Sequence, residues 1–206
     1  MCFIDGFNLY HAIDDLRPRA HYLKWVDLRG LASAFIKPST EELADVFYFS
    51  AYATWIPDAY ARHRAYVKAV TATGVTPVLG QFKNKDRQCL GCKRKWTAHE
   101  EKESDVNLAI HLIQHAHLNN FDKALVMIAD SDLCPAIRMV LNQFPEKEVQ
   151  ILVPPNRYDI SRELRGLATA IKIRQKHLKR NLLPATVHGN NRKISIQRPK
   201  KYQPPA

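Results

Sequence analysis

The sequence has no apolar run as long as the roughly 18 residues that a membrane-spanning helix needs. It also has no leader-like segment, because an apolar strand is predicted to begin at Met1 itself. Only four cysteines are present, and without a secretory signal they are expected to be reduced thiols. These absences predict a cytoplasmic protein with no membrane partner.

Acidic residues are missing from one end of the chain, where none follows Glu163. The last 43 residues contain 11 basic residues, whereas the first 163 balance 20 basic against 20 acidic residues, so the net charge of +11 belongs to the tail. Basic tails commonly bind phosphate backbones, although such a segment could also be solvated and only aid solubility. We favour nucleic acid, because the carboxylate site described below would otherwise repel a polyanion.

What is present is an alternation of short apolar segments and helical patterns, in 206 residues of ordinary globular composition. The alternation predicts one α/β domain with a mainly parallel sheet over residues 1–175. Proline, asparagine and basic residues dominate from Pro184 onward, so residues 176–206 are predicted to be a flexible basic extension. No internal repeat is visible.

Two aspartates separated by one serine follow the apolar run at residues 126–129. The run predicts a buried parallel strand, and the residues after it predict a helix with Pro135 in its first turn. Asp130 and Asp132 would then lie at the carboxyl end of a strand, where open α/β sheets bind ligands. Two such carboxylates repel each other unless a cation lies between them, but an N-cap aspartate with a solvated neighbour is an equal alternative.

A second strand end carries the same kind of side chain. Residues 1–5 predict a short strand ending in Asp5, and Gly6 allows a tight turn where backbone passes close to a ligand. Asn8 could contact a phosphate, a water or Asp5, or it could cap the helix whose pattern starts at Leu9.

A third carboxylate comes from Asp105, at the start of an amphipathic helix over residues 106–116. Strand-to-helix junctions of a parallel sheet converge on one edge, so Asp5, Asp105, Asp130 and Asp132 are expected to meet there. This set would bind one or two Mg²⁺ or Mn²⁺ ions, activate a water and offset the charge of a phosphodiester.

Residues 83–98 break the α/β alternation. Cys89 and Cys92 have the Cys-x-x-Cys spacing of a zinc knuckle, and His99 could be a third ligand of a structural Zn²⁺. The alternative is a plain basic hairpin with two free thiols. In either case the cations and the tryptophan of Lys83–Trp96 predict a second nucleic-acid surface beside the basic tail.

Three stretches together resemble the motifs of the NYN domain, a family of the PIN-like nuclease superfamily; they are residues 4–10, 101–106 and 129–133. The resemblance implies a Rossmann-like three-layer α/β/α fold, PIN-like, with metal-dependent ribonuclease activity. By matching position, Asp5, Asp105, Asp130 and Asp132 would be the metal-binding acids, and Asn8 and Ser131 would line the site. Some relatives carry a Cys-x-x-Cys insertion at the corresponding place. The pair Glu103-Ser104 departs from the more usual pair of small residues, which leaves open whether Glu101 or Glu103 aids the site.

These observations predict a Mg²⁺- or Mn²⁺-dependent RNA endonuclease that holds RNA through its basic tail and the Lys83–Trp96 insertion. The alternatives are a non-catalytic RNA-binding or adaptor module on the same fold, and another phosphoesterase such as a nucleotide phosphatase. Whether the protein forms a homo-oligomer is open.

Overall fold

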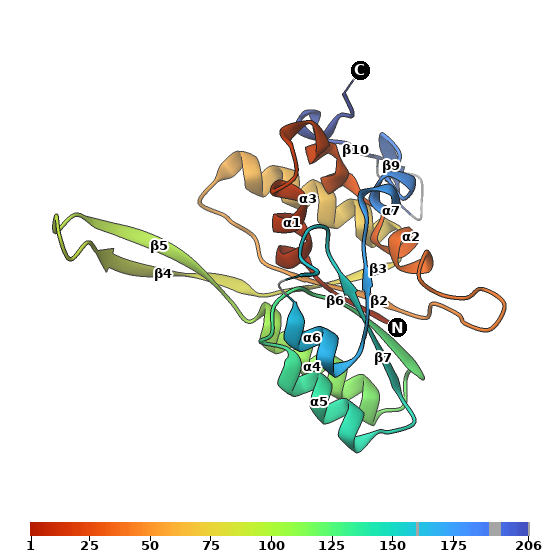
Figure 1. The fold of residues 1–206 in the computed structure, drawn as a ribbon. Helices are drawn as coiled ribbons and strands as arrows, with labels where there is room; N and C mark the ends of the chain where they lie inside the picture. The colour runs from red at the N-terminus through yellow and green to blue at the C-terminus, as the bar shows by residue number, and fades with distance from the viewer. Residues whose placement is uncertain (160, 190–194, 206) are drawn as a thin grey trace.

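A parallel sheet of six strands forms the centre of the protein in the computed structural model, which describes residues 1–159, 161–189 and 195–205. Its strands are β1 (Cys2–Asp5), β2 (Val46–Ser50), β3 (Val75–Leu79), β6 (Lys123–Met127), β7 (Glu148–Val153) and β8 (Thr169–Lys172). All neighbours run parallel in the order β3-β2-β1-β6-β7-β8. Helices cover both faces (Figure 1), so the predicted three-layer α/β/α fold is confirmed.

Two separate hydrophobic clusters explain the three layers. The helices packed on one face are α1 (Gly6–Asp14), α2 (Leu28–Ser33), α3 (Pro57–Ala72) and α7 (Gln175–Arg180). Those packed on the other face are α4 (Ser104–His117), α5 (Cys134–Gln143) and α6 (Arg162–Leu167). Successive strand residues alternate between the layers, as Phe3 and Ile4 show, and both are fully buried. In the described part of the chain, no helix is both long and apolar enough to cross a membrane.

The strand order reverses between β1 and β6. From β1 the chain proceeds outward through β2 to β3, and after a long excursion it returns to the other side of β1 as β6. Ile4 pairs with Met127 in the parallel register, so the carboxyl ends of the two strands lie side by side. Such a switch point is where open α/β sheets form their ligand-binding crevice.

The excursion contains an antiparallel hairpin of β4 (Gln81–Gln88) and β5 (Lys95–Lys102), which extends away from the body of the protein (Figure 1). Gly80 is required where β3 turns into β4, because a Cβ there would lie 2.5 Å from the Lys102 carbonyl oxygen. Residues 83–98 thus lie within an antiparallel pair of strands and their connecting turn.

The zinc ligand set predicted on this hairpin is wrong. Cys89 and Cys92 are free thiols in the turn between the strands, whereas His99 pairs with Asn84 farther along the ladder. The His99 ring instead stacks on Trp55, with their centroids 3.8 Å apart. Throughout the described residues, no group of three or more His, Cys, Asp and Glu side chains is arranged to hold a metal ion.

The prediction of a flexible C-terminal extension is also wrong for the residues described. After α7 the chain forms β9 (Thr186–His188), β10 (Ser195–Gln197) and the short 3₁₀ helix η2 (Lys200–Tyr202). Val187, Ile196 and Tyr202 are buried in the core cluster that includes α3. The segment docks on η1 (Pro18–Trp25), where the Trp25 indole N–H donates to the Pro184 carbonyl at 2.9 Å.

Gly6 opens α1 directly after β1, so the helix starts earlier than its apolar pattern predicts. A Cβ at Gly6 would lie 2.6 Å from Tyr48 Cε2 and 2.7 Å from the Phe49 carbonyl oxygen. The close approach to β2 is by itself enough to require glycine at this position.

We expect Gly6→Ala to lower the free energy of unfolding by about 1–3 kcal/mol, because the added methyl overfills a packed contact with backbone. Gly166→Ala in α6 is the matched control, since a Cβ there meets nothing within 4 Å. That control is expected to be neutral or to stabilise by up to about 1 kcal/mol. Urea denaturation of both variants measures the difference, and equal midpoints would contradict the packing argument.

Candidate functional site

Asp5 is a buried carboxyl at the end of β1, with 3% of its surface exposed. It is the N-cap of α1 and accepts hydrogen bonds from the backbone N–H groups of Phe7 at 2.8 Å and Asn8 at 2.9 Å. Burial nevertheless raises the pKa of Asp5 to about 7, and the negative charges of Asp105 and Asp130 add to this effect. The site thus contains a carboxyl that its surroundings make costly to ionise.

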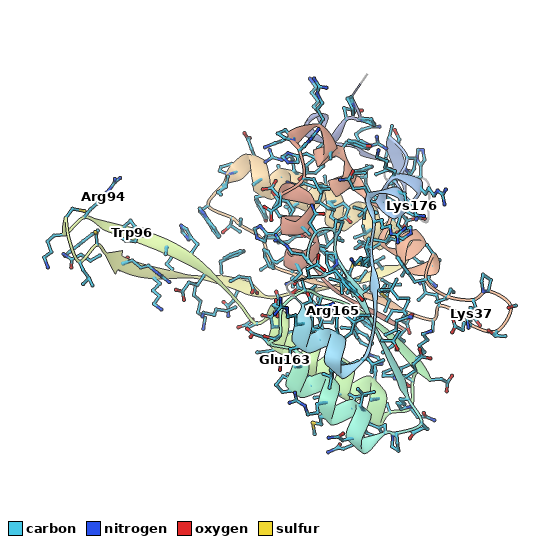
Figure 2. All side chains as sticks on the ribbon, in the orientation of Figure 1. Lys37, Arg94, Trp96, Glu163, Arg165 and Lys176 are labelled. Atoms are coloured by element: carbon cyan, nitrogen blue, oxygen red, sulfur yellow. The ribbon has the colours of Figure 1, made fainter. Side chains whose placement is uncertain are left out.

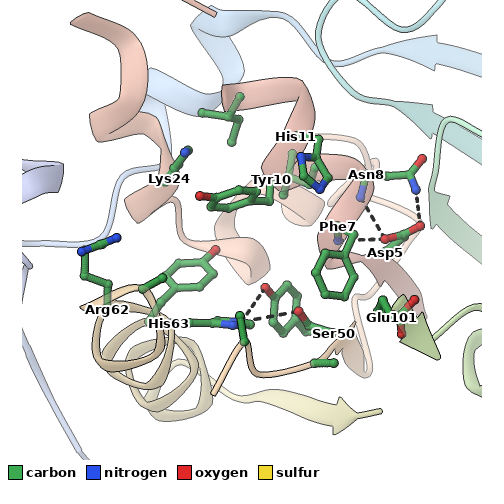
Figure 3. A pocket seen from close by; sticks show the side chains of 18 of the residues that line it. Asp5, Phe7, Asn8, Tyr10, His11, Lys24, Ser50, Arg62, His63 and Glu101 are labelled. Atoms are coloured by element: carbon green, nitrogen blue, oxygen red, sulfur yellow. Dashed lines mark hydrogen bonds between the residues drawn. The ribbon is translucent and has the colours of Figure 1, made fainter. Parts of the chain in front are cut away.

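The side chain of Asn8 joins the two strand ends. Its Nδ2 donates to Asp5 Oδ2 and to Asp130 Oδ2, the latter at 2.9 Å, and its Oδ1 accepts from the Ala129 N–H at 2.6 Å. Figure 3 shows this amide beside the Asp5 carboxyl. Of the alternatives for Asn8, contact with Asp5 is observed, and the capping role belongs to Asp5 itself.

Asp130 begins an exposed turn between β6 and α5. Its Oδ1 accepts from the Asp132 N–H at 3.2 Å, and the Ser131 carbonyl accepts from the Cys134 N–H at 2.9 Å. The Ser161 hydroxyl supports this strand end by donating to the Ala129 carbonyl at 2.7 Å. No sequence motif indicated that Ser161 would contact the site.

Asp105 lies in the first turn of α4, whereas Glu101 belongs to β5. Glu101 Oε1 accepts from the Ser104 N–H at 3.1 Å, which brings the two acids together. Exclusion of water raises the pKa of Asp105 to about 6, and Asp130, Glu101 and Asp132 add to the shift. Glu103 contacts Gln81 instead, so Glu101 is the glutamate at the site.

These side chains surround one cavity of about 610 Å³. Of the site residues predicted from the sequence, five line it: Asp5, Asn8, His99, Asp105 and Asp130. Glu101 joins them, as Figure 3 shows. Ser131 and Asp132 are exposed on the neighbouring turn, outside the lining of the cavity.

The acids at this end of the cavity do not form a ready-made metal site in the described residues, but their chemistry is that of ligands for a hard divalent cation. The carboxylates supply the oxygen ligands that Mg²⁺ and Mn²⁺ prefer. Burial is the main cause of the raised pKa values of Asp5 and Asp105, and neighbouring acids add a smaller contribution that a bound cation would offset.

The other end of the cavity has a different character, which the sequence did not reveal. Its lining includes aromatic side chains, the cations Lys24 and Arg62, and His63. Burial lowers the pKa of His63 to about 4, and its Nε2 lies 3.3 Å from the Tyr48 hydroxyl. No sequence pattern indicated that Tyr202 would lie with Arg62 at this end of the cavity.

Comparisons with known proteins agree with this architecture. No curated protein matches the chain. Among solved structures, a protein of unknown function from Vibrio parahaemolyticus shares 15% sequence identity with a TM-score of 0.58, over 88% of this chain and 94% of that chain. A similarity at this identity shows the fold alone. The sequence model of the NYN domain matches residues 1–174, which is most of the chain. This protein therefore belongs to the NYN domain family, a family of PIN-like nucleases.

Proposed function

We propose that this protein is a metal-dependent ribonuclease that hydrolyses RNA phosphodiester bonds at the cavity beside β1 and β6. The observation that carries the proposal is the meeting of Asp5, Asp105 and Asp130, from three separate segments, at the point where the strand order reverses. Perturbed carboxyls in a cleft at such a point are typical of functional sites.

Asp5, Asp105 and Asp130 would hold Mg²⁺ or Mn²⁺, with Asp132 and Glu101 close by. When bound, the ion supplies positive charge that keeps these acids ionised and offsets the charge of the scissile phosphodiester. Asn8 fixes the separation of Asp5 and Asp130 through its two donated hydrogen bonds. The buried N-cap geometry of Asp5 holds one ligand in place before any substrate arrives.

The hairpin is proposed as an RNA-binding arm. Along the ladder, Glu100 forms ion pairs with Lys85, Arg87 and Lys102 and so offsets part of their charge. Farther out, Lys93, Arg94 and Lys95 are exposed, and Figure 2 shows Arg94 and Trp96 at the outer part of the arm. Exposed cations with an aromatic side chain suit a flexible polyanion with accessible bases. The basic residues of the C-terminal extension are proposed as a second contact with RNA.

The proposal predicts that cleavage depends on Asp130. We expect Asp130→Asn to lower the rate of cleavage of single-stranded RNA in Mn²⁺ by about 10²–10³-fold or more, because the site then has one charged ligand fewer. Asp122→Asn is the control, since this exposed aspartate lies at the opposite end of the same strand. Gel analysis of labelled RNA measures both rates. Equal cleavage by wild type and Asp130→Asn would refute the assignment, and RNA binding without cleavage in any divalent metal would favour the adaptor alternative.

A second prediction concerns stability and pH. The folded protein holds the Asp105 proton more tightly than the unfolded chain, because the pKa is raised from 3.8 to about 6. The stabilisation is complete below the unfolded value and is lost as pH rises through about 6. In EDTA, the Tm of wild type is expected to fall by a few degrees relative to Asp105→Asn between about pH 4 and about pH 8.

Mg²⁺ at the upper pH is expected to recover this difference, because a cation that binds only the folded protein raises its Tm. Asp122→Asn serves again as the control and should follow wild type at every pH. A Tm difference between wild type and Asp105→Asn that is independent of both pH and Mg²⁺ would count against a cation site.

If the arm binds RNA, its contribution to the affinity for RNA should depend on the salt concentration. Replacing Lys93, Arg94 and Lys95 by Gln is expected to weaken binding of single-stranded RNA. The slope of log K against log salt should fall by about 0.7 for each phosphate that the variant no longer neutralises. A matched triple variant replaces Lys37, Lys68 and Arg138, which are exposed on other parts of the protein. Fluorescence anisotropy across a salt series compares the two, and identical slopes would exclude the arm as an RNA-binding surface.

A further inference from the structure

The cavity beside the acidic cluster has two chemically opposite ends. Figure 3 shows Asp5 and Glu101 at one side, with Arg62 and Lys24 at the other. The charge of Lys24 is already paired with Asp14. Arg62 lies beside the Tyr202 hydroxyl, and its Nε is buried without a hydrogen-bond partner among the described residues. No carboxylate among the described residues forms an ion pair with Arg62, so it is the cation at this end whose charge is left for a ligand.

Aromatic rings line the space between the two ends. Tyr10 is 41% exposed, and the Lys24 ammonium lies 4.0 Å from its ring centroid. Tyr48, Tyr66 and Tyr202 are buried and contribute to the lining. Rings of this kind stack on nucleobases with little regard to sequence, because every base has a flat π-face.

The size of the cavity limits what it accepts. At about 610 Å³ it falls within the roughly 300–1,000 Å³ of pockets that hold small ligands and cofactors. A paired base is held within its stack and is not free to enter such a pocket, whereas an unpaired one is. A single unpaired nucleotide offers an aromatic base for the rings and an anionic phosphate for Arg62.

We propose that this cavity is a binding site for one unpaired nucleotide, with its base among the tyrosines and its phosphate on Arg62. The inference rests on the proposed function where the nucleotide is part of RNA, since the acidic cluster would then meet the neighbouring phosphodiester. Tyr202 comes from the C-terminal extension, beyond the residues 1–174 that match the family. The wall that faces the acidic cluster therefore comes in part from a segment outside the family match.

The test is equilibrium binding of adenosine 5′-monophosphate to the full chain, measured by titration calorimetry. We expect Arg62→Gln and Tyr10→Ala to weaken binding about tenfold or more, because each removes a charge-assisted contact or a stacking surface. Arg64→Gln is the matched control, since it removes the same charge from the same helix at an exposed position outside this cavity. Tyr10→Phe should bind like wild type, which separates stacking from loss of fold.

Two further competition measurements identify the source of the nucleotide. A short single-stranded oligoadenylate should compete with the mononucleotide, and the same strand paired with oligouridylate should not. Competition by the single strand assigns the site to RNA, whereas mononucleotide binding without it assigns the site to a free nucleotide.

The inference and the proposed function can fail separately. Mononucleotide affinity that is undetectable in wild type, or equal in the Arg62→Gln and Arg64→Gln variants, overturns the nucleotide site, even if RNA cleavage depends on Asp130. Cleavage that ignores Asp130 overturns the nuclease assignment, even if the mononucleotide binds as expected.

Discussion

The side-chain amide of Asn8 links the carboxyl ends of β1 and β6 at the point where the strand order reverses. Asn8 accepts from the Ala129 N–H and donates to both Asp5 and Asp130, so its amide is satisfied on each side. A carboxylate of the same shape would face two acceptors, and an apolar side chain would leave the Ala129 N–H unpaired at a cost of about 1–3 kcal/mol. The geometry of the acidic cluster depends on this one residue type.

Ionising Asp5 within the acidic cluster lowers the stability of the folded protein, and this loss of stability is evidence about function. Asp5 is buried, faces the charges of Asp105 and Asp130, and has its pKa raised to about 7. A packed apolar residue at the end of β1 would avoid that penalty. Native proteins retain such groups where they serve a ligand, which is why electrostatic strain at a strand end is better evidence of function than the fold alone.

The sequence revealed those parts of the structure that depend on local pattern. Apolar runs ending in aspartate placed Asp5 and Asp130 at strand ends, and the parallel sheet then required that they meet. Contacts set by long-range pairing were not visible. Nothing local indicated that Gln81 pairs with Lys102, so the sequence left open whether Glu101 or Glu103 belongs to the site. The same register separates His99 from Cys89. Short strands such as β9 carry too little pattern to be recognised, so the burial of Val187 was also missed.

The acids that line the cavity and the wall that contains Tyr202 come from different parts of the chain. Every acid of the cluster lies within the residues shared with the family, whereas Tyr202 and the segment that carries it lie beyond them. The extension is held by backbone contacts to η1, such as the Leu183 N–H donating to the Trp25 carbonyl at 3.0 Å. A substitution in the extension can therefore alter the lining near Arg62 while every carboxyl group of the acidic cluster stays in place.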